Sequence, residues 1–478
     1  MILRPQSYPM SDKLLFVCFV LLVPLALGSA SSIFNDGDVS WHIAAGQWIL
    51  AHGRVPSTDP FSYTMSGHPW VAYEWLAEVI YAAGFQLAGY AGVAAVVVAA
   101  MMVLHCIVFT QLRPKVDPAA LLVALMAMDV ILAPFTLARP HVLVWPILAG
   151  WTVGLMRARD AGRAPRSALA LLMLAWANLH GSFSIGLVIA AAFALDALIS
   201  AHWDRRLLRQ WFVFGLLSLA AVLVNANGIA GVVHPLTVAG MKTLPLIQEW
   251  QPSTWSKSPW FFGLLLAVIA GMAIRRVRPR PGEGALLLLM LAMALWQVRH
   301  QSWLAIVAAI VLTPYLARPR RADAAANFSS PKARLVGLWL AAAGAVLLII
   351  GRLMVPLVPD ENGANPRSLI AHIPGSVKGQ PVFNGYTFGG PLILAGIRPY
   401  IDGRADMYGD GLVADYSAIT DGNAVRFNRA VERYGIRWTI LPTGNGPLLR
   451  VLDSSGEWRR VYTDRVGVIH VRQPAAAN

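Results

Sequence analysis

The chain has 478 residues, of which 56% are hydrophobic and only 13% are charged. With a mean hydropathy of +0.55 it lacks the polar surface that a soluble protein of this length needs, so the composition favours a polytopic membrane protein. The net charge of +14 would suit nucleic acid if taken alone, but the basic residues are distributed as membrane topology requires, which excludes that partner. Cys18 and Cys106 lie in apolar segments and support neither a disulfide framework nor a cysteine metal site.

Apolar runs broken by charge, Pro or Gly predict about eleven transmembrane helices. These runs cover residues 14–34, 84–110, 118–137, 141–156, 167–178, 182–200, 210–227, 259–274, 283–298, 301–316 and 335–355. The small residues of "ALGSASS" (26–32) are compatible with signal-peptide cleavage. The many spans that follow favour an uncleaved first helix.

Basic residues lie mainly on alternate loops. The rich loops are at 1–13, 113–115, 157–166, 205–209, 275–280 and 318–334. The positive-inside rule places these loops and the amino terminus in the cytoplasm. The first loop (35–75) and, after eleven crossings, residues 356–478 are then expected outside.

The chain changes character from Lys378 onward. Strand-like runs alternate there with Gly, Asn and Asp turns; they are "PVFNGY", "RPYIDGR", "RWTILP", "WRRVYTD" and "GVIHVR". A helix is predicted around 411–435, ending at Gly435. The predicted fold class is therefore an α-helical polytopic membrane protein, with a transmembrane domain (1–355) and a small α/β extracytoplasmic domain (356–478). Within "IDGRADMYG" we expect an internal Arg–Asp network, with a glycan contact as the alternative.

Polar residues gather at the outer ends of the predicted spans. Charges beside transmembrane helices are costly, so each of them is a functional hypothesis. The outer loops contribute Asp36, Asp38, His42, Glu74, Glu78, Arg139, His141, Asn178, His180, Asn225, Asn227, His234, Glu249, Trp250, Arg299 and His300. We predict one polar cavity, in which Arg and His hold an anion and the acids do acid–base work. Snorkelling to lipid phosphates is the alternative for Arg139 and Arg299; His105 and Asp129 are expected to pack between helices, and Asp196 to balance the inner Arg cluster.

The first outer loop holds the densest set of candidates. Residues 38–52, "DVSWHIAAGQWILAH", have the spacing of an amphipathic helix lying along the membrane surface. Asp38 at its start suits either capping or catalysis. The Asp36-Gly37-Asp38 pair would also suit a divalent cation, although two carboxylates are few ligands for one. Asp59, between two prolines, is interpreted as a turn residue.

An acid directly after the first span, an in-plane helix, a Gly turn and a second acid before the next span resemble the GT-C glycosyltransferases. These include the protein mannosyltransferases and the aminoarabinose transferases of lipid A. In that family the first acid is a general base, which deprotonates an acceptor attacking the anomeric carbon of a polyprenyl-phosphate sugar. Usual members show Asp-Glu where this chain has Asp36-Gly37-Asp38, so either Asp is a candidate.

The blocks "DVSWHIAAGQWILAHGRVPSTDPFSYT", "WANLHGSFSIGL", "RHQSWLA" and "YIDGRADMYG" also resemble a bacterial membrane-protein group of largely unassigned chemistry, often classed beside GT-C enzymes. The resemblance implies inverting sugar transfer from a polyprenyl-phosphate donor to a glycan, lipid or protein acceptor, in a bacterial inner membrane with the C-terminal domain periplasmic. No cofactor is required by the sequence. The implied catalytic residues are Asp38, Asp36 and Glu74, and the implied phosphate or substrate ligands are His42, Arg139, His141, His180, Arg299 and His300. The alternatives are a transporter or flippase of an anionic glycolipid, and an envelope assembly protein acting through its C-terminal domain.

Overall fold

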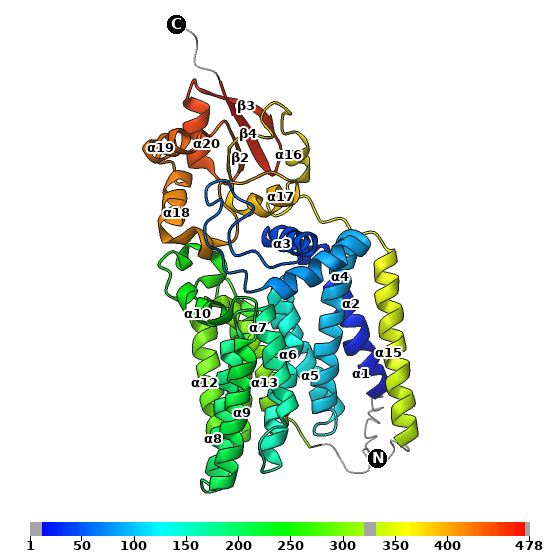
Figure 1. Cartoon of the computed structure of the whole chain (residues 1–478). Helices are drawn as coiled ribbons and strands as arrows, with labels where there is room; N and C mark the ends of the chain where they lie inside the picture. Colours follow the sequence, from blue (N-terminus) through cyan, green and yellow to red (C-terminus); the bar gives the residue numbers. More distant parts are fainter. Residues whose placement is uncertain (1–11, 320–330, 474–478) are drawn as a thin grey trace.

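The computed structural model describes residues 12–319 and 331–473. Long helices stand side by side, and the C-terminal segment sits on one end of this bundle (Figure 1). The first crossing consists of α1 (Asp12–Phe16), the π-helical η1 (Val17–Leu22) and α2 (Val23–Ser29). Later helices are α5 (Pro118–Leu132), α6 (Pro140–Asp160), α7 (Leu171–Leu179), α8 (Phe183–Ser200), α9 (Arg205–Leu223), α10 (Gly228–Ala239), α11 (Pro259–Arg275), α12 (Pro281–Trp296), α13 (Gln301–Leu316) and α15 (Pro331–Met354).

Helical structure covers each of the eleven predicted spans. Among the described residues, four helices are long and apolar enough to cross a membrane, namely Trp75–Leu112, Pro118–Phe135, Phe183–Ser200 and Arg205–Leu223. Six shorter apolar helices accompany them in the described part of the chain. The chain thus has the helices of a membrane protein, while the number of eleven crossings stays a prediction.

Two helices lie across the end of the bundle beneath the C-terminal segment (Figure 1). α3 (Asp38–His52) has the predicted bounds, and it packs on the first part of α4 (Trp75–Leu112) so closely that a Cβ at Gly46 would fall 1.9 Å from the carbonyl oxygen of Glu78. α4 then turns at Ala88 and Gly89, whose φ of +56° needs glycine, before it descends through the bundle. Nine of the 15 residues of α3 are buried, so the protein covers more of this helix than the predicted position along a membrane surface implies.

The C-terminal segment contains a four-stranded sheet of order β1-β2-β4-β3. β1 (Val382–Asn384) runs parallel to β2 (Trp438–Pro442), and β4 (Gly467–Arg472) pairs antiparallel with β2 and with β3 (Trp458–Thr463). Its helices are α16 (Arg367–Ala371), α17 (Gly389–Leu394), α18 (Ala405–Thr420), α19 (Ala424–Tyr434) and α20 (Gly446–Ser454). The single helix predicted at 411–435 is two helices, and Gly435 ends the second with a φ of +65°.

One predicted strand, "RPYIDGR", is not a strand. The side-chain Oδ1 of Asn384 accepts hydrogen bonds from the backbone N–H of Tyr400 at 2.7 Å and of Ile401 at 3.4 Å, and its Nδ2 donates to the Ile401 carbonyl at 2.8 Å. A buried amide therefore satisfies the backbone groups that a neighbouring strand would otherwise pair.

The loops at the opposite end form their own polar cluster. Arg159, only 6% exposed, pairs with Asp196 at 3.2 Å and with Glu283 at 2.6 Å. This confirms Asp196 as a counter-ion of the inner basic cluster. His105 and Asp129, 2.7 Å apart between α4 and α5, are the helix-packing pair that was predicted.

Candidate active site

A cavity of about 1070 Å³ lies between the end of the bundle and the C-terminal segment. Its walls come from the first loop, the start of α4, the α5–α6 connection, residues 244–261, the α12–α13 connection and the C-terminal segment. Seven of the predicted site residues line it, namely Asp36, Asp38, Glu74, Arg139, His141, His180 and Arg299. Five segments far apart in the sequence thus bring their polar side chains to one place.

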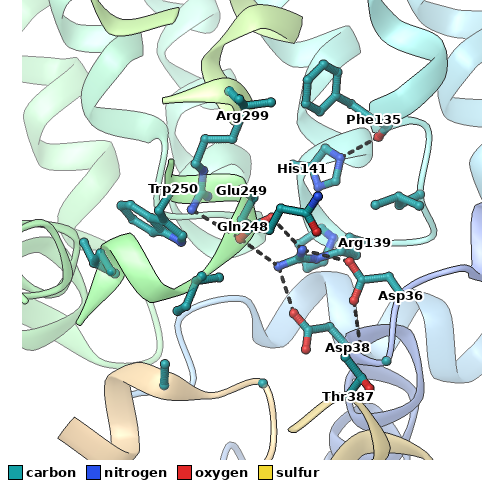
Figure 2. Close-up of a pocket in the computed structure, with 18 of the residues that line it drawn as sticks. Asp36, Asp38, Phe135, Arg139, His141, Gln248, Glu249, Trp250, Arg299 and Thr387 are labelled. Carbon is teal, nitrogen blue, oxygen red and sulfur yellow. Dashed lines mark hydrogen bonds and ion pairs between the residues drawn. The ribbon is translucent and has the colours of Figure 1, made fainter. Parts of the chain in front are cut away.

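Arg139, directly before α6, is the centre of the charged cluster (Figure 2). Its guanidinium contacts the carboxylates of Asp36 and Asp38 at 3.0 Å each. A third carboxylate, that of Glu249, lies 2.8 Å away. Arg139 is therefore occupied by protein carboxylates, as a residue of the predicted polar cavity, and the alternative that it snorkels to lipid phosphates does not fit this geometry.

The two aspartates of the first loop have different surroundings. Asp36 Oδ1 accepts a hydrogen bond from the backbone N–H of Asp38, the first residue of α3, at 2.9 Å. Asp38 Oδ1 instead faces Gly403 of the C-terminal segment, where a Cβ would fall 1.6 Å from it. Burial raises the pKa of Asp38. Arg139 opposes this rise, whereas the negative charges of Asp36 and Glu249 add to it, and the resulting pKa of Asp38 is about 7.

Glu74, at the start of α4, belongs to a second buried group of acids and imidazoles. The backbone N–H of Ser182 donates to His180 Nδ1, so the neutral ring carries its proton on Nε2, 3.4 Å from Glu74 Oε1. Burial raises the pKa of Glu74 to about 8 although Arg139 and Arg299 oppose it. Glu74 is therefore mainly protonated at neutral pH, and it can donate a hydrogen bond into the cavity.

His42 is buried beside Glu74 and is not among the residues that line the cavity; 1% of its surface is exposed. Its ring nitrogens lie 3.9 Å from Glu74 and 3.7 Å from Glu78, and neither has a hydrogen-bond partner among the described residues. Burial lowers its pKa well below the ordinary value, so the ring is neutral. The predicted role of His42 in holding a phosphate does not fit this position.

His300 is likewise absent from the described residues that line the cavity. Its Nδ1 donates to the carbonyl oxygen of Met293 at 3.1 Å, and its ring packs 4.7 Å from that of Trp303. His141 does line the cavity, but its Nε2 donates to the carbonyl oxygen of Phe135 at 2.8 Å (Figure 2). In both imidazoles, one ring nitrogen is thus bonded to a backbone carbonyl and is not free to bind a substrate.

Glu249 was among the polar residues predicted for the cavity, and it does line the cavity, but it was not among the residues predicted to be catalytic or to hold the phosphate. It lies on the 3₁₀ turn η6 (Gln248–Trp250), between Arg139 and Arg299, whose Nη1 is 3.6 Å from Glu249 Oε1 (Figure 2). Burial raises the pKa of Glu249, but the two guanidinium groups outweigh this and lower it to about 2. Arg299 also lies 4.3 Å from the ring centre of Trp250, a cation–π distance.

The C-terminal segment forms the roof of the cavity through contacts between backbones. A Cβ at Gly37 would fall 2.1 Å from the Thr387 carbonyl oxygen, and one at Gly390 would fall 2.1 Å from the Gly37 carbonyl oxygen. Tyr386 and Thr387 line the cavity from this side. Gly37 therefore separates the two aspartates because only glycine permits this approach.

A buried Arg–Asp network ties the first loop to the roof. Arg404 donates to Asp402 at 2.6 and 2.8 Å and to Asp59 at 2.7 Å, and all three side chains are at most 1% exposed. The internal network predicted in "IDGRADMYG" is present, with Arg404 also 4.7 Å from the ring centre of Trp70. Asp59 forms the predicted turn, accepting from the Phe61 and Ser62 N–H groups, and it is also an ion-pair partner of Arg404, which was not predicted.

The carboxylate pair does not form a cation site in this arrangement. Asp36 and Asp38 both direct an oxygen at Arg139, which supplies the positive charge between them. Among the residues that the structure describes, no group of three or more His, Cys, Asp or Glu is arranged to hold a metal ion. The residues fit a guanidinium as their common partner.

Comparison with known proteins identifies the fold. No protein-family model matches the chain, and no curated protein does. The structure is similar to the archaeal oligosaccharyltransferase AglB from Archaeoglobus fulgidus in complex with an inhibitory peptide and a dolichol-phosphate, with a TM-score of 0.52 at 11% identity over 90% of this chain and 70% of AglB. The apo form of the Archaeoglobus fulgidus oligosaccharyltransferase gives a TM-score of 0.53 at 12% identity, over 95% of this chain and 74% of that one. The chain therefore shares the overall fold of these oligosaccharyltransferase structures, a helical bundle with a C-terminal segment that contains a small sheet.

Proposed function

We propose that this chain is a GT-C-type membrane glycosyltransferase that transfers a sugar from a polyprenyl-phosphate donor to a glycan, lipid or protein acceptor. The observation that carries the proposal is the cavity in which Asp36 and Asp38 meet Arg139 and Arg299. The GT-C-like fold supports the class of enzyme. The similar AglB structure contains a dolichol-phosphate, which supports a lipid phosphate as the donor's carrier.

In the proposed reaction, Asp38 is the general base. An acceptor hydroxyl oxygen attacks the anomeric carbon, the bond from that carbon to the phosphate oxygen breaks, and its electron pair stays on the phosphate. The hydroxyl proton passes to Asp38, whose pKa of about 7 makes its carboxylate a stronger base than an exposed aspartate. A single displacement of this kind inverts the anomeric centre.

Arg299 and Arg139 would stabilise the phosphate as its charge grows, through charge-assisted hydrogen bonds. Glu74, protonated at neutral pH because its pKa is about 8, would donate a hydrogen bond to the acceptor and so orient it. No step of this scheme requires a metal ion.

The proposed setting is a bacterial inner membrane with the amino terminus in the cytoplasm. Eleven crossings would then place the cavity and the C-terminal domain, proposed as residues 356–478, on the periplasmic side. The alternation of basic loops supports this orientation. A donor lipid in the outer leaflet would reach the cavity from the membrane, through apolar lining residues such as Ile131 and Phe261.

The rival functions fit less well. Transporter sites tend to lie near the membrane midplane in broken helices, whereas these charges gather at one end of the bundle and are covered by the C-terminal segment. An assembly protein acting only through that segment would not need the charges of Asp36 and Asp38.

The test uses the purified full chain in lipid nanodiscs with a panel of radiolabelled polyprenyl-phosphate sugars and envelope lipid extract as acceptor. We expect Asp38→Asn to lower sugar transfer roughly 10²- to 10⁴-fold, the usual contribution of a general base. Asp421→Asn makes the same chemical change at an exposed site and should be neutral. Full activity of Asp38→Asn, Asp36→Asn and their double variant would remove the base from the proposal, and no transfer by the wild type from any donor would favour a rival function.

A further inference from the structure

Glu249 occupies the position where an anionic substrate group would bind. Its Oε2 lies 2.8 Å from Arg139 Nη1, and its Oε1 lies 3.5 Å from Arg139 Nη2 and 3.6 Å from Arg299 Nη1. Two guanidinium groups facing one anion are the arrangement that recognises phosphate. In Figure 2 the Glu249 carboxylate stands between the two arginines at the cavity.

The other two carboxylate partners of Arg139 are less exposed than Glu249. Asp36 is bonded to the first turn of α3, and Asp38 is enclosed by Gly403. Their side chains are 21% and 18% exposed, whereas that of Glu249 is 32% exposed. Glu249 is therefore the carboxylate of this cluster that can leave with the least disturbance.

The segment around Glu249 is irregular in structure and is anchored at both ends. Within the fully described stretch 240–258, helical structure is limited to the 3₁₀ turns η5 (Leu244–Leu246) and η6. Its ends are anchored: Asp410 accepts from the N–H groups of Lys242 and Thr243, and the Ser253 N–H donates to the Leu295 carbonyl at 2.9 Å. A change of the Glu249 side chain between fixed ends needs no rearrangement of the bundle.

Charge balance favours a phosphate that replaces the Glu249 carboxylate over a phosphate that binds in addition to it. The two arginines already face three carboxylates, so an added phosphate would bring a further negative charge into a buried site, where it is poorly screened. A singly charged phosphate that takes the place of the Glu249 carboxylate, while that carboxylate turns toward solvent, keeps the charge facing the two arginines unchanged. The low pKa of Glu249, about 2, means that it is fully ionised at neutral pH and competes at full strength.

We infer that Glu249 is an internal substitute for the substrate phosphate, which a phosphate ester must displace from between Arg139 and Arg299. The site then takes a lipid phosphate monoester or diester, and Glu249 sets a threshold on its affinity. The inference rests on the proposed function only for the identity of the lipid phosphate, because displacement is measured by binding without any sugar transfer.

The experiment measures binding to the purified full chain in detergent by intrinsic tryptophan fluorescence, with farnesyl phosphate, inorganic phosphate and farnesol as probes. We expect Glu249→Gln to bind both phosphates about tenfold more tightly than the wild type, with farnesol unchanged. The Asp side chain of Glu249→Asp is too short to reach both arginines, so the phosphate affinity of this variant should lie between those of the wild type and Glu249→Gln. Glu457 is an exposed carboxylate paired with Arg472. Glu457→Gln is therefore the matched control and should bind the probes as the wild type does.

Three results would overturn the inference: an unchanged phosphate affinity of Glu249→Gln, a weaker one, or an equal gain for farnesol. A gain for inorganic phosphate alone would identify the ligand as free phosphate instead of a lipid phosphate. A gain for farnesyl phosphate in a protein that transfers no sugar would leave this inference standing while the proposed function fails. Size-exclusion profiles of Glu249→Gln and Glu249→Asp, if both normal, show that the comparison is made on folded protein.

Discussion

Replacing Arg404 with Met tests how the C-terminal segment is fixed to the first loop. Arg404 is 1% exposed, and its loss would leave the carboxylates of Asp59 and Asp402 buried without their cation. Breaking a buried pair in this way costs about 3–5 kcal/mol. Opening of the junction should therefore become roughly 150- to 5000-fold more frequent.

Hydrogen exchange of the first loop measures this opening. The N–H groups of Asp59, Tyr63 and Trp70 are bonded to the carbonyls of His68, Pro399 and Ser57, so their exchange reports on the junction. Arg426→Met is the matched control, because its pair with Asp415 is about half exposed and is worth at most about 1 kcal/mol, or about fivefold in exchange. An effect of Arg404→Met no larger than that of Arg426→Met would refute the reasoning.

Removing the two carboxylates together with Arg404 should partly restore the stability of the contact between the first loop and the C-terminal segment. With Asp59→Asn and Asp402→Asn added to Arg404→Met, the buried charges are gone and only neutral groups remain to be satisfied. Replacing a whole buried ion network is often close to neutral. The triple variant should thus exchange more slowly at these amides than Arg404→Met alone.

Three other variants probe the cavity. Gly37→Ala should destabilise the junction by about 1–3 kcal/mol in thermal unfolding, since its Cβ meets the Thr387 carbonyl oxygen, whereas Gly411→Ala has open space and should not; equal behaviour of the two would contradict the proposed packing. If Asp38 is the base, the transfer rate should rise with pH and level off above about 7, where its carboxyl is deprotonated, and a rate independent of pH through this range would exclude that role. Glu74→Gln should keep most of the transfer activity at pH 7, because Glu74 is protonated below about pH 8. Burial of the Glu74 charge lowers the stability of the wild type as pH rises from 4.5 to about 8. Glu74→Gln should therefore have a higher melting temperature than the wild type in alkali, and a lower one would contradict this.

Local patterns predicted most of the elements. Apolar runs located the helices, and α3 has the bounds of the residues singled out by their spacing. The strand predicted over "RPYIDGR" is absent because Asn384, buried at 0% exposure, supplies hydrogen bonds that only the tertiary structure reveals. The burial of most of α3 was not predicted, because the sequence does not show that the C-terminal segment covers it.

The candidate site was predictable in its membership but not in its contacts. Alternation of basic loops was enough to assign Asp36, Asp38, Arg139 and Arg299 to one end of the bundle. The role of Glu249 depends on where an irregular loop returns, and such loops carry no periodicity from which a position can be read. The Asp59–Arg404 pair joins positions 345 residues apart in the sequence, a pairing that no local pattern contains.

The different surroundings of the two aspartates explain why the motif has two acids. Asp36 uses one oxygen to hold the first N–H of α3 and the other to hold Arg139, so both of its oxygens have partners. Asp38 directs one oxygen to Arg139 and the other toward Gly403 at the cavity roof, which approaches it so closely that only glycine fits there. Asp38 has a pKa near neutrality, which suits a carboxylate that takes the proton of an acceptor hydroxyl. Asp36 and Gly37 thus position the helix start and the roof, and Asp38 is the better candidate for the base.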